Sequence, residues 1–349
     1  MTQDCNNPKC KTKHIDYSHK MPHLDFEYDD EYYPRDDELP DPQIDPVIPG
    51  AAVPLDKVGV SGVDLPVQMV RRDGTVQTLH ATTSLYGSLD DPKAKGLNLS
   101  RFPIVMHEAL ENNLSLDGMK IILDDLRSKQ GSKDIYCKMK FKYPWTQEAL
   151  RTRKELDPRE DGREWSEDDP EVFMIDGDKI LSHEKAEGHI FYDCELEGQH
   201  INDEYKYYLT VHYIYSSTCP CSFELAQHAM QTRNKAANGH SQRSVAKIKV
   251  QFDPSNILYI EDVVEKMREI MPTETVVICK RRDEMAFAER NGSNPVFVED
   301  FMRIAYEALD TWFDEGRIFD FNIVSDHLES LHNWSATAVT SKGIPGGLR

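Results

Sequence analysis

The sequence predicts an α+β fold in which helices lie against antiparallel sheets. Three observations predict it. Several segments alternate apolar and polar residues, which is the period of a strand with one buried face. Other segments space apolar residues three and four apart, as an amphipathic helix does. The order strand-strand-helix-helix-strand-strand occurs twice, so we expect two modules, at residues 51–200 and 201–349.

The first module opens with a predicted hairpin. Residues 58–85 alternate as two paired strands would, and Arg72-Asp73-Gly74 supplies the turn. One helix is predicted at 103–112, and a second runs from the capping residue Ser115 to Gly131. Alternation resumes at 135–143 and again at 190–196. The charged stretch 151–187 interrupts this pattern, and we expect it to be a surface loop or insertion.

The second module repeats the order. Strands are predicted at 205–217 and 245–252, followed by a helix at 256–271 and a short strand at 276–279. A longer helix follows, with Asn294 as its cap and Pro295 in its first turn. Two last strands, at 318–325 and 335–340, complete the module. Open sheets of this kind leave edges, so we expect the chain to oligomerise.

The composition is that of a globular protein. Of 349 residues, 39% are hydrophobic and 29% are charged, and no apolar run approaches the roughly 20 residues that span a bilayer. We therefore expect no membrane partner, and cytoplasmic localisation, since no signal peptide is recognisable. The net charge of −20 argues against nucleic-acid binding, so a phosphate-bearing ligand would need a local basic pocket.

Residues 1–50 are acidic and rich in proline, without a sustained apolar period. We expect this segment to be a mobile N-terminal arm. The seven cysteines are too sparse for a secreted disulfide scaffold, so they are predicted to be reduced thiols or metal ligands.

Two cysteines follow directly on a predicted strand, in the segment Cys219-Pro-Cys-Ser222. Such a pair can also be buried core thiols. However, His240 opens the next strand of the same predicted hairpin, so it returns to the Cys219 end. A thiolate and an imidazole that converge in this way are typical ligands of a divalent metal.

Further polar residues stand near predicted element ends. Lys280-Arg-Arg-Asp-Glu284 combines cations suited to phosphate with carboxylates suited to a metal, although such a run is usually a solvated surface. Glu299 lies in a first helical turn, where a carboxylate often serves only the helix dipole. Glu329 and His332 form an acid/base pair in what is otherwise an ordinary polar loop.

Seven motifs together resemble a known family, the type IB GTP cyclohydrolases. In order they are Val58-Gly-Val with the following Asp-Leu-Pro, Lys95-Gly-Leu-Asn-Leu-Ser-Arg-Phe102, Cys219-Pro-Cys-Ser222, His240-Ser-Gln-Arg-Ser244, Arg282-Asp-Glu284, Asn294-Pro-Val-Phe-Val-Glu-Asp300 and Glu329-Ser-Leu-His-Asn333. The resemblance covers about residues 41–338. It implies a tunnelling fold and a homotetramer with active sites at subunit interfaces.

The resemblance also implies roles for residues. Cys219, His240 and Glu284 match positions at or near the metal, and Cys221 matches a second thiol whose role stays open. Glu299 matches the carboxylate that anchors guanine. Glu329 and His332 match an acidic and histidine loop that could move protons.

The implied reaction is that of GTP cyclohydrolase I. A divalent ion lowers the pKa of bound water, and the hydroxide attacks guanine C8; ring opening and loss of formate give 7,8-dihydroneopterin triphosphate for folate-type biosynthesis. Zinc, manganese and iron(II) all suit the donor types. The expected triphosphate contacts are Arg101, Arg243, Lys280 and Arg281.

The chain departs from the family pattern at Asn98, Ser241 and Trp334, where histidine, asparagine and histidine are usual. Substrate choice or rate could therefore differ. Three alternatives stay open: a cyclohydrolase acting on another purine or pterin triphosphate or giving a different product, a non-catalytic structural metal protein, and a nitrile reductase that uses a cysteine nucleophile and NADPH.

Overall fold

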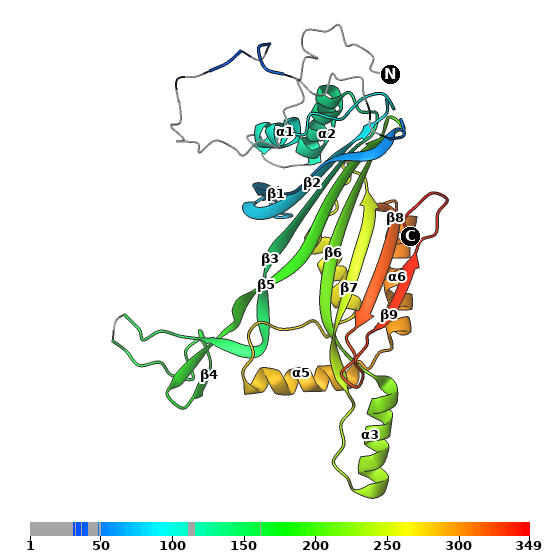
Figure 1. Cartoon of the computed structure of the whole chain (residues 1–349). Helices are drawn as coiled ribbons and strands as arrows, with labels where there is room; N and C mark the ends of the chain where they lie inside the picture. Colours follow the sequence, from blue (N-terminus) through cyan, green and yellow to red (C-terminus); the bar gives the residue numbers. More distant parts are fainter. Residues whose placement is uncertain are drawn as a thin grey trace, which may run out of the picture.

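The computed structural model describes residues 31, 33–35, 37–40, 48, 50–110, 116–160 and 162–349. This part of the chain forms one nine-stranded antiparallel sheet and six helices (Figure 1). Most of the predicted N-terminal arm at residues 1–50, and the predicted cap Ser115, lie outside the described residues. No helix in the described ranges is long and apolar enough to cross a membrane.

The strands are β1 (Leu55–Val70), β2 (Val76–Leu89), β3 (Ile135–Glu155), β4 (Val172–Asp176), β5 (Lys179–Ile201), β6 (Glu204–Thr218), β7 (Ser241–Phe252), β8 (Ile318–His327) and β9 (Ala336–Ser341). The helices are α1 (Arg101–Leu110), α2 (Leu116–Gln130), α3 (Pro220–Arg233), α4 (Ile260–Ile270), α5 (Arg281–Ser293) and α6 (Val298–Asp314). The strands lie in the order β1-β2-β3-β5-β6-β7-β8-β9, and β4 pairs with β5 off this path.

The predicted tunnelling fold of two modules with separate sheets is wrong. β5 and β6 pair directly, from Cys194 opposite Val211 to Ile201 opposite Glu204, and this hairpin joins both halves into one continuous sheet. The reason lies in backbone pairing. A break between β5 and β6 would expose two further sheet edges with unpaired N–H and C=O groups.

The stretch 151–187, predicted to be a surface loop or insertion, holds the end of β3, all of β4 and the first part of β5, which project from the body (Figure 1). Two other local predictions are wrong. Residues 276–279 form no strand; the nearest pairing is an isolated bridge between Tyr215 and Glu274. Asn294 caps the C-terminus of α5, and α6 begins later, after Phe297.

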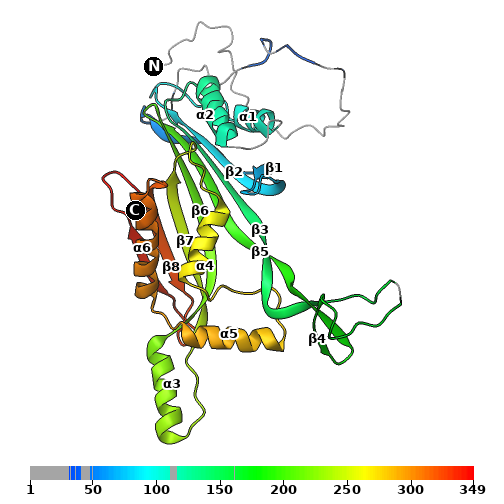
Figure 2. The same ribbon diagram turned by 180° about the vertical axis from the view of Figure 1, so that it is seen from behind.

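The two faces of the sheet differ in chemistry. Helices α1, α2, α4 and α6 cover one face, as Figure 2 shows from behind. Tyr215 and Ile248 point to this face and are fully buried, and Tyr215 stacks on Phe301 of α6 with ring centroids 4.7 Å apart. The other face carries charged pairs between strands, such as Lys249 with Glu197 at 2.9 Å. Burial against the helices therefore fixes the sheet from one side only.

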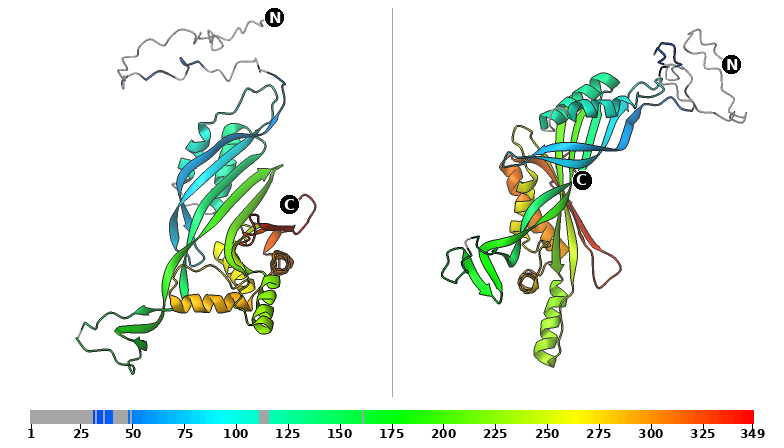
Figure 3. Two further views of the ribbon diagram at one scale, coloured as in Figure 1. Left: turned by 60° about the horizontal axis from the view of Figure 1, so that its bottom comes forward. Right: turned by 90° about the vertical axis from the view of Figure 1, so that its left-hand side faces the viewer.

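The ends of β6 and β7 lie where α3 projects from the sheet (Figure 3). Pro220 occupies the first turn of α3, a position that suits its fixed φ and missing N–H. The chain therefore leaves β6 at Cys219, enters α3 at once and returns to begin β7 at Ser241. The segment between β6 and β7 therefore starts and ends at the same edge of the sheet, with Cys219 at one end and His240 at the other.

We expect Leu309→Ala in α6 to lower the free energy of unfolding by about 2–5 kcal/mol, because Leu309 is fully buried and its loss leaves a cavity. The matched helix variant Leu225→Ala, at a residue that is 69% exposed, should change it by no more than about 0.5 kcal/mol. Urea denaturation measures both. Equal effects of the two variants would contradict the assignment of α6 to the core.

Candidate active site

The backbone brings Cys219 and His240 together. Thr218 and Ser241 are opposite each other at the last position of the β6–β7 ladder. One residue beyond, the Cys219 N–H donates to the His240 carbonyl at 3.2 Å. The Ser222 hydroxyl accepts from the His240 N–H at 3.1 Å, which ties the first turn of α3 to the same point. The proximity expected of these two residues is therefore present, whereas their roles stay predictions.

The imidazole of His240 faces two acceptors. Its Nδ1 lies 3.0 Å from Oε1 of Gln242 and 3.5 Å from Oε2 of Glu329. The side chains of His240 and Glu329 are 18% and 12% exposed, so the interaction is largely shielded from solvent. Glu329 comes from the loop after β8, which the Leu328 N–H fixes to the Arg243 carbonyl at 3.1 Å.

A buried hydrogen-bond network continues behind His240. The Gln242 amide donates to the Ser217 hydroxyl at 2.9 Å, and Ser217 lies 3.2 Å from Nδ1 of His327. Nε2 of His327 is 2.9 Å from the hydroxyl of Tyr215. Because each polar group finds a partner, the network can stay buried without the penalty of an unsatisfied group.

His327 is held neutral. It is 2% exposed, and burial lowers the pKa of its imidazole to about 4, although the Glu299 and Asp326 carboxylates oppose this shift. A neutral ring can accept at one nitrogen and donate from the other. That property lets His327 link the Ser217 and Tyr215 hydroxyls.

We expect the free energy of unfolding to fall less between neutral and acidic pH in His327→Gln than in the wild-type protein. The unfolded chain takes up a proton near pH 6.5, whereas folded His327 does so only near 4. Its contribution is therefore present above about pH 6.5 and is lost as pH falls towards 4, by roughly 3 kcal/mol. Urea denaturation at about pH 7.5 and about pH 4.5 compares the two proteins. Equal losses in both would contradict this role.

Two further predicted residues lie at this end of the sheet. Glu299, in the first turn of α6, interacts electrostatically with His327. The Val296 N–H before it donates to the Thr218 carbonyl at 3.0 Å, which fixes the start of α6 beside Cys219. His332 is exposed in the loop after β8. Its ring stacks on Trp334, one of the departures from the family pattern, with centroids 4.2 Å apart.

A second group of predicted residues lies elsewhere, at the N-terminus of α5. It comprises Lys280, Arg281 and Glu284. An ion pair between Arg282 and Asp176 joins this end of α5 to β4. The other end, at Gly292, lies against the ring of Phe223 in α3. About nine residues of helix, roughly 13 Å, therefore separate Glu284 from the end of α5 that lies against α3.

The remaining predicted phosphate contacts are also dispersed. Lys280 and Arg281 line a cavity of about 300 Å³ with Lys179 and Arg153. Arg101 begins α1, at the far end of the sheet from α3 (Figure 1), and donates to a backbone carbonyl of α2. Arg243 is exposed between the buried Gln242 and Ser244, so it points away from the helix-covered face. The described chain does not gather these four cations.

A divalent metal fits part of the site. A thiolate and an imidazole are suitable donors, and His240 has the partner on its other nitrogen that a ligating histidine usually has. Among the described residues, however, no three His, Cys, Asp or Glu side chains gather closely enough to hold a metal ion. One chain thus brings two of the three predicted ligands to this place.

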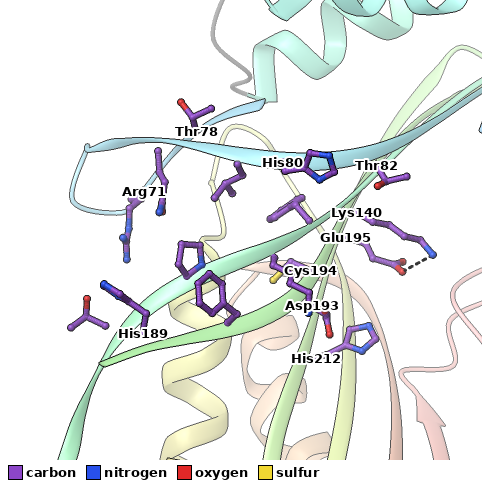
Figure 4. A pocket seen from close by; sticks show the side chains of 17 residues that line it. Arg71, Thr78, His80, Thr82, Lys140, His189, Asp193, Cys194, Glu195 and His212 are labelled. Carbon is purple, nitrogen blue, oxygen red and sulfur yellow. Dashed lines mark ion pairs between the residues drawn. The ribbon is translucent and has the colours of Figure 1, made fainter. Parts of the chain in front are cut away.

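A large cavity lies on the charged face instead. It has a volume of about 830 Å³ and includes His80, Lys140, Asp193 and His212 in its lining (Figure 4). None of the predicted site residues lines it. Cavity size therefore does not mark the place where Cys219 and His240 meet.

Sequence reasoning missed Gln242, Ser217 and His327. The signal for Gln242 was present, since a residue two positions after His240 in a strand lies on the same face. Ser217 faces Gln242 across the β6–β7 ladder, which follows from the register. The position of His327 depends on the pairing of β8 with β7, which local pattern alone does not specify.

Comparison with known proteins identifies the family. The sequence model described as "Type I GTP cyclohydrolase folE2" matches residues 39–160 and 173–338. The chain belongs to this family. The match includes every predicted site residue and leaves out part of the stretch between β3 and β4. The expected resemblance to GTP cyclohydrolases is thereby confirmed.

Relatives agree with this assignment. GTP cyclohydrolase FolE2 of Dinoroseobacter shibae is 36% identical over 312 residues, which is 88% of this chain and 75% of the relative. The protein of the same name from Paracoccus denitrificans is 35% identical over 321 residues, or 91% and 88%. Among solved structures, uricase from Arthrobacter globiformis is 9% identical with a TM-score of 0.46, covering 86% of this chain and 96% of that one.

Proposed function

We propose that the chain converts GTP to formate and 7,8-dihydroneopterin triphosphate at the site around Cys219 and His240, as a type IB enzyme. Membership of the family gives the class of activity, GTP cyclohydrolase. The location is supported by the end of the β6–β7 ladder, where the backbones of Cys219 and His240 are hydrogen-bonded and the His240 imidazole has a partner on Nδ1. Action in the cytoplasm is part of the proposal.

The proposed metal ligands are Cys219, His240 and Glu284. When bound, a divalent cation (Zn²⁺, Mn²⁺ or Fe²⁺) would supply a Lewis acid that activates water for attack at guanine C8. Cys219 would bind as the thiolate and His240 through Nε2, because Nδ1 is already hydrogen-bonded. Glu284 is too far along α5 to join them from the same chain, so the proposal requires it from another subunit.

The other residues act on substrate and protons. Glu299, beside the start of α6, would accept from the guanine N–H groups. Glu329 and the exposed His332 would move protons during ring opening. The triphosphate would bind the dispersed cations Arg101, Arg243, Lys280 and Arg281.

Assembly as a homotetramer is also proposed, and the separation of the predicted residues supports association of some kind. The predicted residues occupy separate places in one chain, and symmetric association can bring different surfaces together. The proposal is therefore that active sites form between subunits.

We expect Cys219→Ala to reduce kcat by at least about 100-fold, since it removes a ligand of the proposed metal. Cys137→Ala is the matched control. Burial raises the pKa of the Cys137 thiol, so it stays protonated in the core and should not affect turnover. Anaerobic incubation with GTP, following formate and an oxidised fluorescent pterin, measures both. Full activity in Cys219→Ala would place the chemistry elsewhere.

Removal of metal by a chelator should abolish formate release, and adding back zinc, manganese or iron(II) should restore it. The same measurement tests the alternatives. Bound metal without turnover of GTP, but with turnover of another purine triphosphate, would indicate a different cyclohydrolase. Bound metal without turnover of any triphosphate would indicate a structural metal site.

Mixing two inactive variants tests the shared site. If Cys219 and Glu284 act from different subunits, dissociating and reassembling Cys219→Ala with Glu284→Ala should restore about a quarter of the active sites. If both residues act within one chain, every site keeps a defect and the mixture stays inactive. Formate release after reassembly distinguishes these outcomes.

A further inference from the structure

Gln242 occupies the centre of the network. It lies on the helix-covered face of β7, is 6% exposed and faces Ser217 across the ladder. Its amide nitrogen lies 2.9 Å from the Ser217 hydroxyl and 3.3 Å from Oε1 of Glu329, while its oxygen lies 3.0 Å from Nδ1 of His240. One side chain thus contacts three polar groups that come from three strands or strand ends.

The orientation of this amide follows from its neighbours. An ionised carboxylate only accepts hydrogen bonds, so the amide nitrogen has to face Glu329 and the oxygen has to face His240. The Ser217 hydroxyl accepts the second N–H and remains free to donate its own hydrogen to Ser244, 2.8 Å away, or to His327. A flipped amide would set its oxygen against the carboxylate.

This orientation determines the state of His240. A carbonyl oxygen cannot donate, so the hydrogen in the 3.0 Å contact belongs to Nδ1. Oε2 of Glu329, 3.5 Å from the same nitrogen, favours a hydrogen there over a lone pair. In the neutral ring, Nε2 then carries the lone pair.

We propose that Gln242 is a positioning residue. It fixes the tautomer and ring orientation of His240 so that Nε2 carries the lone pair and can bind a metal ion. Glu329 shares this task through the same nitrogen, in addition to its proposed part in proton transfer. The tautomer follows from the hydrogen bonds alone, whereas its use in metal binding rests on the proposed function.

The first test observes the tautomer in metal-free, full-length protein. Solid-state nitrogen NMR of histidine-labelled protein at mildly alkaline pH, with His240→Gln to assign the signal, should show hydrogen on Nδ1. Gln242→Met removes the acceptor 3.0 Å from Nδ1 and leaves only the longer contact to Glu329 at 3.5 Å, so the tautomer with hydrogen on Nε2 should appear beside the original one. Hydrogen on Nε2 in the wild-type protein, or an unchanged signal in Gln242→Met, would overturn the inference.

The second test measures zinc affinity by competition with a chromophoric chelator. Gln242→Met should weaken binding by about 10–100-fold, as loss of a partner to a ligating histidine does. Gln147→Met is the matched control. Gln147 is 8% exposed and bonds Glu274, Thr275 and Val277 at 2.9–3.0 Å, so its loss should destabilise the fold without weakening zinc. Equal zinc affinity in the two variants would overturn the inference that Gln242 supports metal binding. A wild-type protein that does not bind zinc would contradict the proposed function instead, and the tautomer measurement alone would then test the role of Gln242.

Discussion

The pairing of β6 with β7 is the interaction on which the site depends. Its register places Ser217 opposite Gln242 and Thr218 opposite Ser241, so the next residues, Cys219 and His240, meet where the ladder ends. A slip of one residue would turn Gln242 to the charged face, because strand side chains alternate. Burial of every second β7 residue, such as Ile248, against the helices opposes that slip. Core packing and site geometry are therefore set by one register.

Polar residues extend that buried face to the site. From Tyr215 outward, the helix-covered face of β6 and β7 changes from apolar side chains to hydroxyl, amide and imidazole groups. Such groups are tolerated in a core only when they are hydrogen-bonded, and a satisfied network is more rigid than isolated pairs. The neutral state of His327 contributes to this, since a charged ring would have to be desolvated. The network thus supports His240 from behind.

The sequence predicts some parts of this arrangement better than others. Alternation was strong enough to predict the strands that become β6 and β7, and hence the approach of His240 to Cys219. Helices α3 and α5 escaped prediction because they bury only Ala226 and Asp283, so no apolar stripe marks them. The predicted tunnelling fold was wrong, since local patterns do not show that β5 pairs with β6 and joins all strands into one sheet. Motif order identified Glu284, but it could not show that α5 holds this residue away from Cys219 in one chain.

We propose that the end of the β6–β7 hairpin delivers a thiolate and an imidazole to one metal ion. X-ray absorption spectroscopy of the zinc-loaded, full-length enzyme would show these ligands. We expect one sulfur ligand at about 2.3 Å, with the remaining ligands nitrogen or oxygen at about 2.0–2.2 Å. The sulfur contribution should disappear in Cys219→Ala. A shell without sulfur in the wild-type enzyme, or one whose sulfur persists in that variant, would exclude Cys219 as a ligand.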